Sequence, residues 1–243
     1  MSQFMDMIRL PNYGLGVAKG QFDDITHIHK FGAVPAMSQN PSGSIWDVND
    51  TLYPWSAFDT AGTLSIPAVN ASDNGKTVVI VGLDSDYLEL SEEVTVSSSG
   101  ATATTQSFKR VQEAYISNGS TNAVGAILIN KGATTVAKIT VGRAKTLMAV
   151  YTVPAGKTGY ILQGTGTCQY GADATGDMFV RYFGQSSFVD GHSFEVSGDG
   201  GQYQYTFGVP IKIPAKSDID VRAKVRSNNA RVTAAFCMIL DED

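Results

Sequence analysis

The sequence is poor in the residues from which metal and redox sites are built. Its 243 residues include only 2 cysteines and 3 histidines, and Cys168 and Cys237 belong to no Cys-x-x-Cys pair. Two separated cysteines in apolar or small-residue surroundings favour buried free thiols over a disulfide. The chain also has no phosphate-binding P-loop and no Gly-x-Ser-x-Gly motif. We therefore expect no metal, no cofactor and no catalytic residues, and predict that the protein is not an enzyme.

Long apolar runs are missing too. No stretch approaches the roughly 20 apolar residues of a membrane-spanning helix. The opening residues MSQFMDMIRL interrupt their apolar patch with Asp6 and Arg9, unlike a secretory signal peptide. Charged residues make up 17% of the chain, and its net charge of −5 argues against nonspecific binding of nucleic acid. We expect a protein that is made in a cytoplasm and binds neither membrane nor nucleic acid.

The best candidate for a metal site is the pair His27 and His29. Residues two apart on a strand share a face, and Asp23 and Asp24 lie nearby. The third histidine, His192, is distant in sequence. We therefore interpret the pair as surface or interface histidines.

The residues that are abundant favour β-structure. The chain has 25 glycines and many Val, Thr and Ser residues, which suit short strands joined by tight turns. A hydrophobic residue followed by Pro-Ala occurs at 66–68, 153–155 and 213–215, and each time a polar turn follows. Proline fixes φ and donates no backbone hydrogen bond, so we expect a strand to end at each of these corners. We predict an all-β, antiparallel, jelly-roll-like β-sandwich.

The clearest strand is Asp218–Arg226, which alternates apolar and charged residues. Ile219, Val221, Ala223 and Val225 share one face, which we expect to be buried, while the opposite face should be solvated. That second face carries a basic stripe, Arg222, Lys224 and Arg226. The stripe is either a solvated surface or a contact for an acidic partner.

The first 60 residues differ from the rest. Glycine and proline interrupt every periodic run, yet both tryptophans of the chain lie here. We predict an irregular extended N-terminal arm over 1–60, followed by sandwich parts over 61–145 and 146–243, which form either two domains or a single interleaved domain over 61–243. The arm could lie on the protein's own core or on a neighbouring subunit. The candidate interface residues of the arm and of the basic stripe are Phe22, Phe31, Trp46, Tyr53, Trp55, Phe58, Arg222, Lys224 and Arg226.

Charge is distributed unevenly along the chain. Residues 1–107 carry 4 basic and 12 acidic residues, whereas 108–243 carry 14 basic and 11 acidic residues. A chain polarised in this way can contact copies of itself through opposite ends, although the two signs can equally lie on two faces of a monomer. We expect a homo-oligomer, and by analogy with β-sandwich proteins at shell symmetry axes a trimer.

Four segments follow one another in a fixed order: TVVIVGLDSDYLELSEEVTV (77–96), QSFKRVQEAYISNG (106–119), GAILI (125–129) and TLMAVYTVPAGKTGYI (146–161). In this order they resemble a family of tailed-bacteriophage virion structural proteins known from marine and environmental phages. The lead-in GAVPAMSQNPSGSIWDVNDTLYPW (32–55) is similar as well. The resemblance implies a virion component made in the host bacterial cytoplasm. It suggests a capsid decoration or cement protein that binds the major capsid protein, and it supplies no catalytic residues.

One alternative function rests on the tyrosines of Gln202–Phe207. Tyr203 and Tyr205 should share a face of a strand, and aromatic faces can stack on sugars. The alternative is a tail-associated receptor-binding or carbohydrate-binding β-sandwich.

Overall fold

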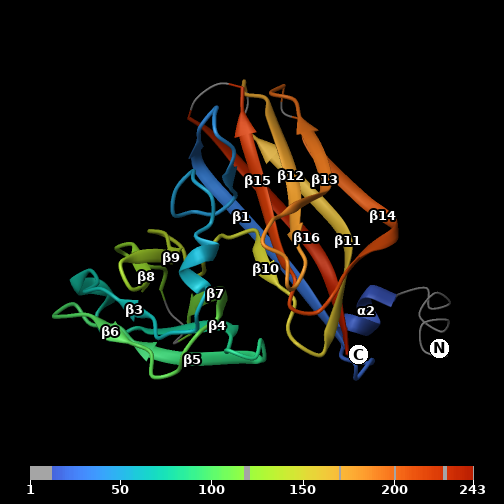
Figure 1. The fold of residues 1–243 in the computed structure, drawn as a ribbon. Coiled ribbons are helices and arrows are strands. Elements are labelled where there is room, and N and C mark those ends of the chain that lie inside the picture. The colour runs from blue at the N-terminus through green and yellow to red at the C-terminus, as the bar shows by residue number, and fades with distance from the viewer. Residues whose placement is uncertain (1–12, 118–120, 170, 200, 227–228, 243) are drawn as a thin grey trace.

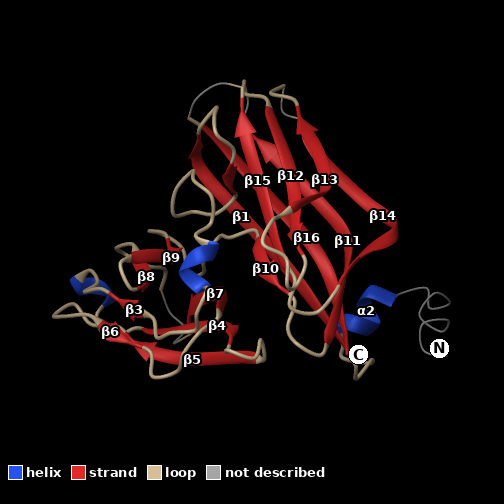
Figure 2. Ribbon diagram, viewed as in Figure 1, coloured by secondary structure: helices blue, strands red, loops and turns tan. Residues whose placement is uncertain are grey.

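The computed structural model describes residues 13–117, 121–169, 171–199, 201–226 and 229–242 (Figure 1). Almost all regular structure in these residues is antiparallel β-sheet (Figure 2). Within the described residues, helical turns are confined to α2 (Tyr13–Ala18), η1 (Trp55–Phe58) and η2 (Ala71–Asp73). The predicted fold class, all-β and antiparallel, is confirmed.

Among the described residues, no helix is long and apolar enough to cross a membrane.

The strands pack as two sandwiches (Figure 1). The larger one has sheets ordered β1–β16–β11–β14 and β10–β15–β12–β13, with β2 added to β15. Its strands are β1 (Ile25–Met37), β2 (Gly43–Ser44), β10 (Val150–Thr152), β11 (Lys157–Cys168), β12 (Ala174–Arg181), β13 (Val189–Val196), β14 (Gln202–Ile213), β15 (Asp218–Val225) and β16 (Ala230–Glu242). We call it the large sandwich.

The second unit, here the small sandwich, has sheets ordered β6–β3–β8–β9 and β5–β4–β7. Its strands are β3 (Ser65–Ile66), β4 (Thr77–Leu83), β5 (Glu89–Thr95), β6 (Thr102–Ala103), β7 (Arg110–Ile116), β8 (Ile127–Lys131) and β9 (Thr134–Ile139). Apolar side chains from both of its sheets, such as Ile80 of β4 and Ile129 of β8, are buried in a common core.

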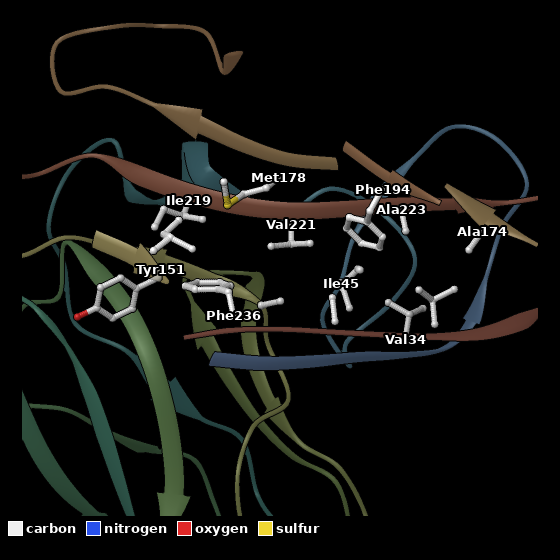
Figure 3. Packing of buried hydrophobic residues seen from close by; sticks show 14 of the residues in the cluster. Val34, Ile45, Tyr151, Ala174, Met178, Phe194, Ile219, Val221, Ala223 and Phe236 are labelled. Atoms are coloured by element: carbon white, nitrogen blue, oxygen red, sulfur yellow. The ribbon is translucent and has the colours of Figure 1, made fainter. Parts of the chain in front are cut away.

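The core of the large sandwich lies between its two sheets, as the side chains in Figure 3 show. The predicted buried face of Asp218–Arg226 is confirmed, because Ile219, Val221, Ala223 and Val225 are all buried here. Across the interior they meet Val34 of β1 and Phe236 of β16. Period-2 patterning therefore identified the core face of this strand correctly.

The predicted corners also coincide with strand ends. β3 ends at Ile66, β10 ends just before Val153, and β14 ends at Ile213. At the second corner Gly156 has φ 73°, a left-handed conformation that glycine adopts without steric cost. The Pro-Ala motif marks strand termination in these three places, whereas at Val34-Pro35-Ala36 it lies inside β1.

The N-terminal segment differs from the predicted arm in one respect. Ile25–Met37 is a regular strand that pairs with β16 along almost its whole length. Its apolar pattern is not alternating, because both faces are covered near Gly32, where an added Cβ would lie 2.2 Å from the carbonyl oxygen of Ile45. Pro35 lies at a register shift between Val34 and Met37, where no ladder hydrogen bond is lost. Residues 1–12 of the predicted arm lie outside the described residues.

Candidate binding surfaces

Residues 38–60 connect the two sandwiches and carry four of the predicted interface aromatics. Trp46, Tyr53, Trp55 and Phe58 are only 2%, 3%, 7% and 0% exposed. The Tyr53 ring meets the two indoles edge-on at centroid distances of 5.1 and 4.8 Å. The prediction that these four residues contact another molecule is corrected: they lie in the core of the small sandwich. Of the two surfaces left open for the arm, its own fold is the one they bury against.

A buried ion cluster joins the two sandwiches behind this segment. Asp218 of β15 is 2% exposed and accepts hydrogen bonds from Arg110 of β7 at 2.9 and 3.1 Å. Arg181 of β12 donates to the same carboxylate at 3.0 and 2.6 Å, and the Thr152 hydroxyl donates at 2.6 Å. Arg110 is the member from the small sandwich. Five hydrogen bonds to one carboxylate offset much of the cost of burying it.

The indole of Trp55 completes the junction. Its Nε1 donates to Asp220 at 3.0 Å, and its ring lies 5.5 Å from the guanidinium carbons of both Arg110 and Arg181. Cations over an indole face are attracted by the ring quadrupole. Trp55 therefore holds the sandwiches together through polar and aromatic contacts at once.

The charged face of β15 is less solvated than predicted. Asp220 is fully buried, because residues 53–58 cover this part of the strand. Arg222 pairs with Asp220 at 2.9 Å and lies 4.3 Å from the centre of the Phe179 ring, so it is half-buried. Lys224 and Arg226 are exposed, as expected for a solvated stripe. The prediction of one continuous basic stripe is thus corrected to its last two members.

The two remaining predicted interface residues lie near the surface. Phe31 of β1 is 38% exposed, and Phe22 is half-buried beside Gly16. They lie far from Lys224 and Arg226 in the sequence.

A groove of about 350 Å³ lies between β1 and the β5–β4–β7 sheet. Its lining includes His27, His29, Lys30, Glu113 and Lys145. His29 Nδ1 is 3.1 Å from the Cys237 sulfur, and desolvation followed by the charge of His27 lowers the pKa of His29. In the part of the chain that the structure describes, no three His, Cys, Asp or Glu side chains gather as a metal site would require.

Lys30 gives this groove a measurable pH dependence. Its ammonium is buried and donates to the backbone carbonyl of Gln112, and burial lowers its pKa from 10.5 to about 8. The folded protein therefore releases this proton at a lower pH than the unfolded chain does. The free energy of unfolding should rise between pH 8 and 10.5, by up to about 3 kcal/mol.

The variant Lys30→Met should lack this rise, because it carries no titrating group in the groove. Urea unfolding of both proteins across the alkaline range measures the difference. We expect the variant to be the more stable one at pH 7 and the gap to close as the pH approaches 10.5. Parallel stability curves would show that Lys30 titrates normally.

The large sandwich has an open flank, which we define as the edge strands β13 and β14. Each ends the strand order of its sheet, and β14 is the outermost strand in Figure 1. Exposed apolar side chains gather there: Val209 is 83% exposed, Tyr205 47% and Val189 43%. Residues 207–210 form a bulge opposite β11, and Val209 lies in it.

The tyrosines of β14 share a face, as predicted. The rings of Tyr203 and Tyr205 stack at 6.4 Å with an interplanar angle of 11°. Tyr203 also stacks on Phe194 at 4.8 Å, which ties it to the core, whereas Tyr205 remains accessible beside His192. Tyr205 is therefore the member of the pair that a ligand could reach.

A small cavity of about 160 Å³ lies where loops of both sandwiches meet. Tyr87, Lys109, Phe183 and Lys216 line it, and we call it the Tyr87 pocket. Sequence reasoning missed it, because its residues come from four separate loops with no common local pattern. The one sequence signal was the corner at 153–155, which hydrogen-bonds to the backbone of both Tyr87 and Lys216.

Comparison with known proteins gives little further guidance. No known family matches the sequence, and no curated protein matches it significantly. Among solved structures, the chain is similar to a protein of the empty top-component particles of cowpea mosaic virus, at 10% identity and a TM-score of 0.22 over 73% of this chain and 82% of that one. VP2 of the infectious bursal disease virus subviral particle gives 10% identity and a TM-score of 0.21 over 90% and 72%. TM-scores this low do not establish a shared fold.

Proposed function

We propose that this chain is a non-enzymatic structural protein of a tailed-phage virion. Within that class we propose a capsid decoration or cement protein that binds the assembled shell and neighbouring copies. The proposal rests first on the order of the four segments described above. In the structure they correspond to the β4–β5 hairpin, β7, β8 and the β10–β11 corner, which form much of both sandwiches.

The structural observation that carries the proposal is the open flank. Residues 202–206 form a straight edge with no charged residue, and Val209 is almost fully exposed. Edge strands of monomeric proteins are usually protected by charges, prolines or bulges. In β14 these features, the bulge, Pro210 and Lys212, lie in its second half, and residues 202–206 carry none of them. An uncharged edge beside exposed apolar side chains suits a contact with another protein. We assign this contact to the shell or to a second copy of the chain.

This proposal places the contact on the open flank and not on the predicted N-terminal arm. Trp46, Tyr53, Trp55 and Phe58 are used inside the fold, so they cannot bind a shell without unfolding the small sandwich. The open flank takes their place as the surface offered to partners. Lys224 and Arg226 can add charge complementarity to an acidic partner.

Immunogold electron microscopy of the phage particles, with an antibody against the folded chain, tests the proposal. Regular labelling over the head supports decoration of the capsid. Labelling confined to the tail would replace the decoration role with the adsorption role described below. Unlabelled particles from cells that express the protein would contradict any virion role.

The variant Val209→Glu tests the open flank itself. A charge placed at this exposed position should weaken attachment to particles by about tenfold or more, because it must be desolvated in an apolar contact. The melting temperature should hardly change, since the side chain is solvated in the free protein. Co-sedimentation with purified particles measures attachment.

The matched control is Val141→Glu, at a residue of the small sandwich that is 57% exposed and lies off the flank. It should attach normally. Equal attachment of the Val209→Glu protein and the wild type would show that the flank is not the binding surface.

A second candidate function is carbohydrate binding on the tail. The accessible ring of Tyr205, with Phe207 at 4.9 Å and His192 at 5.5 Å, favours it, because an aromatic platform of this kind can stack on a sugar. A glycan array read with the wild type and Tyr205→Ala distinguishes it from the first. Binding that is lost in the variant, together with tail labelling, would favour this function.

A further inference from the structure

We propose that the Tyr87 pocket binds a hexuronic acid unit, a sugar ring that carries a carboxylate. The pocket is separate from the open flank, and the inference does not depend on a virion role. Its volume of about 160 Å³ is below the roughly 300–1,000 Å³ typical of sites for drug-sized ligands. A cavity of this size suits one monosaccharide.

The charge of the pocket favours an anion. Four cations line it, Lys109, Arg110, Arg181 and Lys216, against two carboxylates, Asp59 and Asp218. Asp218 is already bound by both arginines, as described above. Among the described residues, no carboxylate oxygen lies within 4.0 Å of the ammonium of Lys109 or Lys216.

Those two ammonium groups differ in how freely they can meet a ligand. Lys109 donates to the backbone carbonyl of Asp59 at 2.7 Å. Desolvation and the charge of Arg110 lower its pKa, which is consistent with a positive potential in the pocket. The ammonium of Lys216 lies near two aromatic rings, at 5.8 Å from the centre of Tyr87 and 5.2 Å from that of Phe183. Lys216 is therefore the cation best placed to receive a carboxylate.

The rings favour a sugar over a simple anion. Phe183 is 60% exposed and meets Tyr87 at 5.8 Å with the two rings nearly perpendicular, so much of its ring surface is accessible to a ligand. A carboxylate alone would not need such a surface. A pyranose ring that stacks on it would place an attached carboxylate beside Lys216.

The backbone holds the pocket in shape. Tyr87 and Lys216 have φ of 66° and 61°, left-handed conformations that are uncommon for residues other than glycine. One corner fixes both of them: Ala155 N–H donates to the Tyr87 carbonyl at 2.8 Å, and Lys216 N–H donates to the Val153 carbonyl at 2.8 Å. Strain of this kind persists where the surrounding structure enforces it, and it often accompanies binding sites.

Isothermal titration calorimetry tests the proposal with a panel of trisaccharides built from galacturonic, glucuronic or mannuronic acid. We expect at least one of them to bind, to bind more weakly as salt is raised, and to lose about tenfold in affinity in Lys216→Gln, the loss expected for one charge-assisted contact. Phe183→Ala should weaken the same ligand. Lys19→Gln and Leu52→Ala, two exposed positions outside the pocket, should bind as the wild type does.

Three results would overturn the proposal. Equal binding of the neutral galactose trisaccharide would show that the carboxylate is not recognised. Binding of hexaglutamate that depends on Lys216 but not on Phe183 would identify an acidic peptide as the ligand. Failure of every uronic acid trisaccharide to bind at millimolar concentration would remove the site.

Discussion

Replacing Asp218 with alanine is expected to lower the free energy of unfolding by about 3–5 kcal/mol, because it leaves buried positive charge without a partner. Arg110 is only 5% exposed, and its Nε and Nη2 both donate to Asp218. Arg181 and Thr152 lose their acceptor as well. Urea unfolding monitored by tryptophan fluorescence measures the loss, and Trp55 in the junction makes the signal local.

The matched control is Arg226→Ala, which breaks an exposed ion pair. Arg226 meets Asp173 at 3.2 Å with its side chain 83% exposed, so its loss should cost less than about 1 kcal/mol. The double variant Arg110→Met, Asp218→Ala should lose less free energy of unfolding than the sum of the losses in the two single variants. The reason is that it also removes the Arg110 guanidinium, which Asp218→Ala alone leaves buried without its partner. If Asp218→Ala and Arg226→Ala cost the same, the cluster does not hold the sandwiches together.

Deleting residues 1–58 is expected to abolish cooperative folding. The deletion removes β1, which pairs with β16 from Ile25 to Met37, and four core aromatics of the small sandwich. Loss of a single buried Trp or Phe side chain costs about 3–5 kcal/mol, whereas a whole domain is stable by about 5–15 kcal/mol. Near-UV circular dichroism and the thermal melt should both show no native transition.

Deleting residues 1–20 is the matched control. It removes α2, which makes few contacts with the large sandwich, and leaves β1 and the segment 38–60 in place. The shorter deletion should melt cooperatively within a few degrees of the full chain. A cooperative melt of the 1–58 deletion would show instead that this whole segment is a separable arm.

These two predictions concern the part of the molecule where sequence and structure diverge most. A segment with aromatic residues among glycines and prolines can either extend onto a neighbouring subunit or pack against the core of its own fold. Local sequence cannot decide between the two, because both bury the same side chains. The segment packs inside the fold because Trp55 donates a hydrogen bond to Asp220, which lies far away in the sequence on β15. On the same strand, Asp218 is the polar partner of Arg110 from the small sandwich.

The charged face of β15 is a second place where the local sequence did not predict which side chains are buried. Its alternation identified Ile219, Val221, Ala223 and Val225 as core residues, since side chains on a strand alternate between faces. The opposite face was expected to be solvated throughout. It is exposed at Lys224 and, just after the strand, at Arg226, whereas the small sandwich and residues 53–58 cover Asp218 and Asp220.

The sequence by itself determined the antiparallel all-β class, the strand ends at the three Pro-Ala corners and the core face of β15. Those features follow from local chemistry: β-branched residues, fixed proline φ and period-2 patterning. Only the tertiary structure decided which aromatics are buried, how an ion cluster joins the sandwiches, and that Tyr87, Lys109, Phe183 and Lys216 meet in one pocket. Contacts between residues far apart in the chain depend on how whole sheets pack, and no local pattern encodes that packing.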